Sequence, residues 1–187
     1  MYHTALSKGK QYSGTPAQVF HGYDVFAFVH DIEQGLTEEH MKADFLYTEL
    51  TWKAGIDSFY MRVGKTPPHF NEFMTRFTFA LKPFEKPIFI IAGKESAAFF
   101  PDFFQTDILF SAHGNSPAIL YSNRKSVWPA TTELLMMWLV KSYKIGTDPC
   151  CGYGNLIQAA RSFSPHTKII ASDFNALCIG YIAETFK

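Results

Sequence analysis

The chain has 187 residues, a length that suits one domain with a sizeable hydrophobic core. Hydrophobic residues make up 47% of it and aromatic residues 17%, which excludes a disordered tail or linker and predicts an ordered globule. Lys and Arg total 17, as do Asp and Glu, so the formal net charge is zero. A balanced charge argues against strong non-specific attraction to nucleic acid, although it allows a locally basic face.

Cysteine and apolar content bound the class of protein further. Three cysteines, two of them adjacent, make neither a disulfide framework nor a spaced pair of metal ligands, so we expect no metal site. The sequence shows no signal peptide and no apolar run long enough to span a membrane. The default expectation is a cytoplasmic protein without a membrane partner.

Short strand-like runs alternate with helical ones, which is typical of an α/β sheet. Several of the strand runs are almost entirely apolar, as expected of strands covered on both faces. In chain order the predicted elements are strand Gln18–Tyr23, helix Asp31–Lys42, strand Ala43–Glu49, helix Phe70–Leu81, strand Pro87–Ala92, helix Glu95–Phe103, strand Asp107–Ala112, strand Ala118–Ser122, helix Thr131–Lys141, strand Lys144–Thr147, helix Asn155–Ser162, strand Lys168–Ser172 and helix Ala176–Phe186.

Two strands in the middle of the chain lack a helix between them. The stretch HGNSP, His113–Pro117, separates them and reads as a hairpin turn, so one antiparallel hairpin is expected beside mostly parallel strands. Thr131 is followed by Glu133 and by apolar residues at helical spacing, which predicts a capped amphipathic helix. No repeat or linker interrupts the pattern, so residues 1–187 are predicted to form a single domain.

The stretch TDPCCGYGN, near the end of the chain, has the form of a cofactor-binding loop. A strand ends at Asp148, Gly152 and Gly154 permit close backbone approach, and Asn155 is placed to cap the next helix, whose N-terminus attracts anions. Asp173 follows 19 residues after Gly154, where an acid grips ribose hydroxyls. Because the third glycine of dinucleotide loops and a phosphate-binding Lys are both missing, S-adenosylmethionine fits better than NAD or ATP. A tight strand–helix turn without ligand is the alternative.

The loop DPCCGYGN resembles the D-P-F-C-G-S-G-T loop of the DNA amino-methyltransferases, which methylate adenine or cytosine amines. WPATTELL, Trp128–Leu135, is similar to the K-P-x-E-L-L helix of the circularly permuted subgroup, with Trp in place of Lys, and AILYSNRK resembles the strand before it. VFHGYD, Val19–Asp24, looks like the N-terminal strand whose acid reads the adenine of the cofactor, one residue out of step. The resemblance implies cofactor-binding roles for Asp24, Asp148, Pro149, Cys150, Gly152, Gly154, Asn155, Asp173 and Phe174.

In that subgroup the catalytic half precedes the cofactor half, which explains a cofactor loop so late in the chain. The resemblance implies a Rossmann-like, seven-stranded methyltransferase fold in circularly permuted order. Residues 1–125 would form the catalytic half and residues 126–187 the cofactor half. The strand at 144–147 should then lie beside the strand at 43–49, bringing Asp148 and Glu49 to the same carboxyl edge of the sheet.

The family carries D-P-P-Y/F/W at the end of its fourth strand, where the acid accepts a hydrogen bond from the target amine and the aromatic ring stacks on a flipped base. Here the corresponding residues are Glu49, Leu50, Thr51 and Trp52. An acid and an aromatic residue remain, both prolines are replaced, and the acid is one methylene longer. Glu49, Thr51 and Trp52 are the catalytic candidates, with residues 53–69 as a substrate loop ahead of the next helix.

These features predict an S-adenosylmethionine-dependent methyltransferase that acts on a nucleobase amine, with adenine in DNA as the first expectation. One alternative is a catalytically degenerate methyltransferase fold that serves as a cofactor-binding or partner subunit, which the missing prolines favour. A second is a methyltransferase for RNA or a small molecule. No connection is long enough for a separate target-recognition domain, so a partner subunit that supplies recognition is a further expectation.

Overall fold

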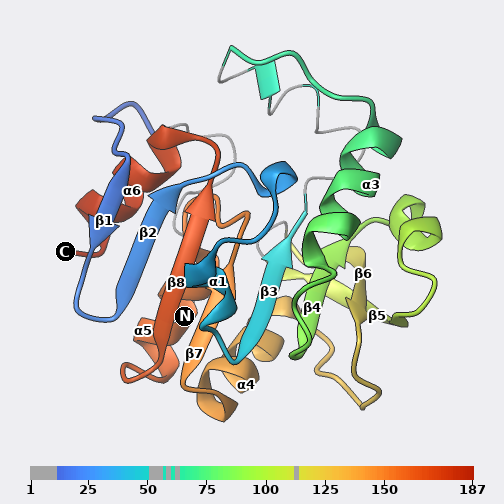
Figure 1. Cartoon of the computed structure of the whole chain (residues 1–187). Coiled ribbons are helices and arrows are strands. Elements are labelled where there is room, and N and C mark those ends of the chain that lie inside the picture. Colours follow the sequence, from blue (N-terminus) through green and yellow to red (C-terminus); the bar gives the residue numbers. More distant parts are fainter. Residues whose placement is uncertain (1–11, 51–56, 58–59, 62–63, 112–113) are drawn as a thin grey trace.

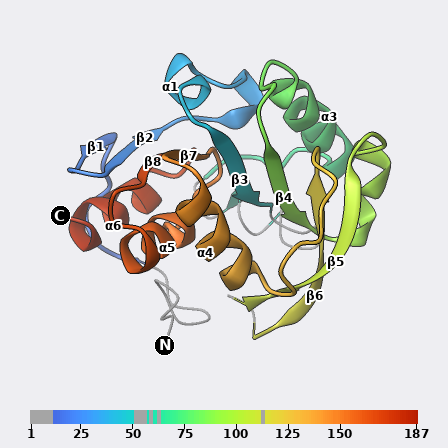
Figure 2. The same cartoon turned by 90° about the horizontal axis from the view of Figure 1, so that it is seen from below.

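The computed structural model describes residues 12–50, 57, 60–61, 64–111 and 114–187. These residues form three layers, with one sheet between two layers of helices (Figure 1). Helices α4, α5 and α6 cover one face, and α1 and α3 cover the other, which is clearest in the view along the sheet (Figure 2). None of the helices in the described part of the chain is long and apolar enough to cross a membrane.

The described residues contain strands, α-helices and two short 3-10 helices, η1 and η2. In chain order they are β1 (Val19–His21), β2 (Val25–Val29), η1 (Ile32–Gln34), α1 (Glu38–Met41), β3 (Phe45–Glu49), α3 (Phe70–Leu81), β4 (Ile88–Ala92), η2 (Lys94–Phe99), β5 (Phe104–Phe110), β6 (Ser116–Ser122), α4 (Thr132–Ser142), β7 (Ile145–Asp148), α5 (Asn155–Phe163), β8 (Lys168–Asp173) and α6 (Ala176–Thr185).

The strands of the described residues make one eight-stranded sheet in the order β1-β2-β8-β7-β3-β4-β6-β5. Strands β2, β8, β7, β3 and β4 run parallel, while β1, β6 and β5 are antiparallel to their neighbours. Strand β7 lies beside β3, with Phe45 opposite Gly146 and Leu46 opposite Thr147. The predicted adjacency of the first and last strand–helix units is therefore confirmed, and with it the mostly parallel α/β fold.

Because side chains alternate between the two faces of the sheet, the hydrophobic core consists of two clusters. On β3, Phe45 and Tyr47 pack with the residues of α4, α5 and α6, whereas Leu46 packs with those of α3. Because side chains alternate along a strand, Glu49, two residues after Tyr47, also faces the layer of α5. Gly146 makes room for this packing, since a Cβ there would stand 2.5 Å from the ring of Phe45.

The predicted hairpin is confirmed at β5 and β6. Gly114 and Asn115 both have positive φ, 66° and 59°, which suits the tight turns that match strand twist. The register pairs Phe110 with Ser116 and continues to Phe104 opposite Ser122, so β5 begins three residues before the predicted start. Residues 112 and 113 of the predicted strand and turn lie outside the described residues.

Seven strands were expected, and the difference arises near the N-terminus. The predicted strand Gln18–Tyr23 is only the first arm of a second hairpin, whose other arm is the apolar run of β2. The amide of Gly22 donates to the carbonyl of Val25 at 2.7 Å across this turn. Strand β2 joins the parallel sheet through its pairing with β8, so the prediction lacked the strand that lies next to β8.

Two predicted helices are wrong in form. The segment Asp31–Lys42 is split into η1 and α1, because Gly35 adopts φ 99° and Thr37 starts a new helix as its N-cap. The segment Glu95–Phe103 forms only η2, which ends before Phe100. Pro101 follows directly, and a proline disfavours helical geometry in the residue before it.

Candidate functional site

Acidic side chains meet at the carboxyl edge of the parallel strands. Glu49 ends β3, Asp148 ends β7 and Asp173 ends β8. These three strands are neighbours in the sheet, because β7 pairs with β3 on one side and with β8 on the other. Asp31 follows β2 by two residues, and β2 pairs Val29 with Asp173. Because ligands of open α/β sheets bind at this edge, the four acids define the candidate site.

Glu49 is partly buried and held on both oxygens. Its Oε1 accepts a hydrogen bond from the Tyr47 hydroxyl at 2.5 Å, and its Oε2 accepts one from Asn155 Nδ2 at 2.9 Å. Burial raises the pKa of Glu49, and the two hydrogen bonds oppose that shift. The predicted catalytic acid is thus fixed between its own strand and the first residue of α5.

Asn155 differs in role from the prediction. The N-cap of α5 is Gly154, at φ 84°, and no side chain caps this helix. Asn155 is instead the first helical residue, and its amide links the cofactor loop to Glu49. A loop residue that reaches across 106 positions of sequence to the acid at the end of β3 ties the two predicted halves of the site together.

The loop between β7 and α5 is bonded to the end of β8. Asp173 Oδ2 accepts from the amide of Gly152 at 2.9 Å and its Oδ1 from the amide of Asn175 at 2.9 Å. The amide of Cys151 donates to the carbonyl of Ser172. Gly152 has φ 49°, and a Cβ built there would meet nothing within 4 Å, so open space adjoins the backbone at this position. Asp148 Oδ1 accepts from the amide of Cys150 inside the same turn.

Burial raises the pKa values of Asp148 and Asp173, and the charges of neighbouring acids add to the shift. Asp148 is 3% exposed, and burial together with the charges of Glu49 and Asp173 raises its pKa well above the usual value. Asp173 is 2% exposed, and burial raises its pKa to about 6. The charge of Asp31 adds to this shift, and the two backbone hydrogen bonds oppose it. Clustered acids with raised pKa values favour a cationic ligand, which would stabilise their ionised forms.

The pKa of Asp173 predicts a pH dependence of stability. A carboxyl with a pKa of about 6 when folded and about 3.9 when unfolded adds stability below pH 4 that is lost as the pH rises through 6, about 3 kcal/mol in all. Burial lowers the pKa of His40 to about 4, so this residue has the opposite effect: its contribution to stability increases as the pH rises through the same range. We therefore expect the difference in unfolding free energy between wild type and Asp173→Asn to shrink or reverse from pH 4 to pH 7, as urea denaturation would measure. A pH-independent difference would contradict the raised pKa.

Asp24 does not join the other predicted residues. It precedes β2 at the amino edge of the sheet, where Val25 pairs with Ile169, and its Oδ1 lies 3.2 Å from the Arg161 guanidinium. The acid that the same strand brings to the carboxyl edge is Asp31, which was not among the predicted site residues. Recognising Val25–Val29 as a strand would have placed Asp31 just beyond its end.

Phe174 lies against the described part of the predicted substrate loop. The ring of Tyr60 stacks on it, with centroids 4.9 Å apart, and Lys65 Nζ stands 4.8 Å from its centroid. Lys65 also donates to Asp31 at 3.1 Å. Tyr60 and Lys65 therefore pack against the residue that follows β8, and Lys65 also binds Asp31. Thr51 and Trp52, the other predicted catalytic residues, lie outside the described residues.

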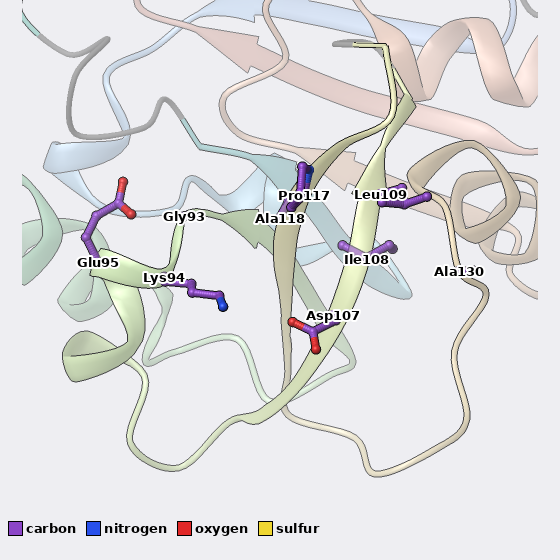
Figure 3. A pocket seen from close by; sticks show the side chains of 9 residues that line it. All are labelled: Gly93, Lys94, Glu95, Asp107, Ile108, Leu109, Pro117, Ala118 and Ala130. Carbon is purple, nitrogen blue, oxygen red and sulfur yellow. The ribbon is translucent and has the colours of Figure 1, made fainter.

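A pocket of about 480 Å³ lies beside the end of β4, the strand next to β3. It lies where β4 ends and η2 begins, against the β5/β6 hairpin, and Glu49 pairs with Ile91, two residues before its wall at Gly93. Figure 3 shows Lys94 and Asp107 reaching inwards from opposite walls, while Glu95 points away. Ile91, Ile108 and Ala118 belong to the same core cluster as Tyr47, so the pocket opens on the face to which Glu49 points.

Cys150 lies in the predicted cofactor loop, next to these acids. Burial and the charge of Asp148 raise the pKa of the Cys150 thiol well above its usual value, which keeps the sulfur a neutral filler of the turn. Among the described residues, no group of three or more His, Cys, Asp or Glu side chains is placed to hold a metal ion.

Comparisons with known proteins agree with this architecture. No family model matches the chain, and no curated protein matches it. Among solved structures, TTHA0409 of Thermus thermophilus, named "Putative DNA Modification Methylase", matches with a TM-score of 0.56 at 12% identity, over 86% of this chain and 93% of the other. Its complex with S-adenosyl-L-methionine matches at 11% identity with a TM-score of 0.55, over 86% of this chain and 92% of the other. M1.HpyAVI matches at 14% identity with a TM-score of 0.50, over 87% of this chain and 99% of the other. The chain has the fold of these methylases.

Proposed function

We propose that the protein is an S-adenosylmethionine-dependent methyltransferase acting on the exocyclic amine of a nucleobase, with adenine in DNA as the first candidate. The observation that carries the proposal is the cluster of buried acids around a Gly-x-Gly loop at the carboxyl edge. S-adenosylmethionine brings both a sulfonium and an ammonium cation, which suits acids whose pKa values burial has raised. The fold shared with methylases solved with this ligand supports the same choice.

The residues around the loop suit an adenosine. Asp173 has acceptor capacity left on each oxygen beyond its backbone partners, which suits two ribose hydroxyls. The space beside Gly152 admits a ligand close to the backbone, and Phe174 offers an aromatic surface at the start of the next helix. When bound, the cofactor supplies an activated methyl group; Pro149, Cys150, Gly154 and Asn155 shape the loop that would hold it.

Glu49 would act on the substrate amine. Ionised, its carboxylate accepts a hydrogen bond from one N–H of the amine, turns the nitrogen lone pair towards the methyl group and stabilises the positive charge that develops on nitrogen. Tyr47 and Asn155 fix its position for this task. Thr51 and Trp52 follow it in sequence, and Trp52 is the residue we propose to stack on the base.

The neighbouring pocket would receive the substrate. It lies at the end of β4, the strand beside that of Glu49, and its floor includes the apolar Ile108, Leu109 and Ala118, with Lys94 and Asp107 facing each other above it. An apolar floor with a donor and an acceptor at its rim suits a planar heterocycle. The formal charge of zero leaves little electrostatic attraction to a long duplex, which favours recognition through a partner subunit.

A second candidate is a catalytically silent subunit that binds the cofactor. Both family prolines after the acid are replaced, and both oxygens of Glu49 already have partners within the protein. RNA or a small-molecule amine remains the alternative substrate if the enzyme is active.

Incubation with tritiated S-adenosylmethionine and pools of DNA, RNA and nucleosides distinguishes the active methyltransferase from the silent subunit and identifies the class of substrate. We expect binding of the cofactor in calorimetry and transfer of tritium to DNA, with the label recovered on the adenine amine. Binding without transfer to any pool would establish the silent subunit instead. Failure of the wild-type protein to bind the cofactor at all would overturn the proposal.

A further inference from the structure

A buried histidine on the far side of the sheet is bonded to the strand that holds the cofactor loop. His40 is 0% exposed and lies at the third position of the short helix α1. Its Nδ1 accepts from the backbone amide of Thr37 at 3.0 Å, in a capping box. Because Nδ1 is an acceptor there, the ring proton is on Nε2, which faces Ser172 Oγ at 2.9 Å.

Ser172 connects His40 to the loop through a second hydrogen bond. Since its oxygen accepts from His40, its own proton is available to the carbonyl of Pro149, at 3.3 Å. The backbone carbonyl of Ser172 accepts from the amide of Cys151. One residue of β8 thus fixes the loop at two points, and the histidine determines which way its hydroxyl proton points.

Burial keeps this arrangement in a single protonation state. Both His40 and Ser172 are 0% exposed, and a buried polar group costs free energy unless its hydrogen bonds are made. The rings of Phe28 and His30 lie beside His40, at 5.1 Å and 5.6 Å between centroids, and close the site from β2. The chain of bonds therefore runs from α1 through the sheet to the loop without a water-exposed step.

We propose that His40 is a positioning residue for the cofactor loop, acting through Ser172 and the carbonyl of Pro149. The proposal rests on the proposed function in that the loop binds S-adenosylmethionine. It assigns His40 no contact with the ligand. Its role is to hold the loop in the shape that the ligand requires, so its loss should be felt at residues 149–152 and not across the sheet.

The test compares Ser172→Ala and Ser172→Thr with His40→Gln and the double variant His40→Gln/Ser172→Ala. Removing the Ser172 hydroxyl should weaken S-adenosylmethionine binding about five- to tenfold in calorimetry, the scale of one hydrogen bond, and threonine should restore it to within about twofold. His40→Gln should produce a similar loss. The double variant should be no weaker than the weaker single variant, because both changes break the same chain of bonds.

A matched control separates positioning from general destabilisation. Thr167 is 3% exposed and immediately precedes β8, at the end opposite Ser172, and its hydroxyl donates to the carbonyl of Val140 at 2.6 Å. Thr167→Val should lower the melting temperature comparably while leaving the affinity unchanged. Amide exchange gives a readout that needs no ligand: the amides of Cys151 and Gly152 should exchange faster in the Ser172 and His40 variants, and those of residues 169–171 should not.

The outcomes are distinct. Unchanged affinity and unchanged exchange in Ser172→Ala, or losses matched by Thr167→Val, would overturn the positioning role. If wild type binds no S-adenosylmethionine, the proposed function fails, and the exchange measurement still decides whether His40 orders the loop.

Discussion

Asp173→Ala is expected to weaken S-adenosylmethionine binding by about 1.5–3 kcal/mol, or roughly 10- to 150-fold, because it removes a charged acceptor for the ribose hydroxyls. The structure adds a second reason. The same carboxylate accepts from the amides of Gly152 and Asn175, so alanine also frees the loop from the end of β8. Asparagine at this position keeps the volume and one acceptor oxygen, and therefore one of the two backbone bonds, so Asp173→Asn should lose less affinity in calorimetry than Asp173→Ala.

Asp24→Asn is the matched control, because it changes an acid of the neighbouring hairpin at the opposite edge of the sheet. Its affinity for the cofactor should equal that of wild type. If Asp173→Ala also binds as wild type does, Asp173 has no part in holding ribose. A loss in Asp24→Asn as large as that in Asp173→Ala would show instead that affinity follows the stability of the sheet.

Local pattern was enough to predict the parts of the fold that depend on it. Strands β3, β4, β7 and β8 are buried on both faces, and all of them except β7 contain a mostly apolar run that stands out from the flanking helices. The adjacency of β7 and β3 came from the resemblance, because no short-range signal specifies which strands pair. The errors fall where one residue redirects the backbone: Gly35 ends η1 at φ 99°, and Pro101 stops η2.

The candidate site was predicted as separate motifs, and the structure supplies their connections. The sequence places Glu49 and Asn155 in different motifs, and only the fold brings the amide to within 2.9 Å of the carboxylate. His40 and Ser172 carried no motif at all, since a buried histidine in a four-residue helix is indistinguishable in sequence from a solvated one. Asp31 was missed because the strand before it was missed.

Glu49→Gln is expected to lower the rate of methyl transfer about 100-fold while leaving the affinity for the cofactor nearly unchanged. Glutamine keeps the shape of the side chain but replaces one acceptor oxygen with an NH2 donor, so the amine loses a positioned acceptor on the scale of one such group. The change also meets two donors already in place, the Tyr47 hydroxyl and Asn155 Nδ2, and only one of them can keep an oxygen partner. Single-turnover assays with saturating cofactor measure the step directly.

Two further variants decide what a loss of activity means. Glu49→Asp retains the acid that the related motif carries at this point, so it should keep more activity than Glu49→Gln despite its shorter reach. Glu85→Gln makes the same chemical change at an exposed position before β4 and should transfer methyl groups as wild type does. Should the aspartate and glutamine variants be equally and fully active, Glu49 takes no part in the reaction. If wild type binds the cofactor but transfers no methyl group, the Glu49 carboxylate is only a structural link between β3 and α5, and the hypothesis of a catalytically silent subunit is supported.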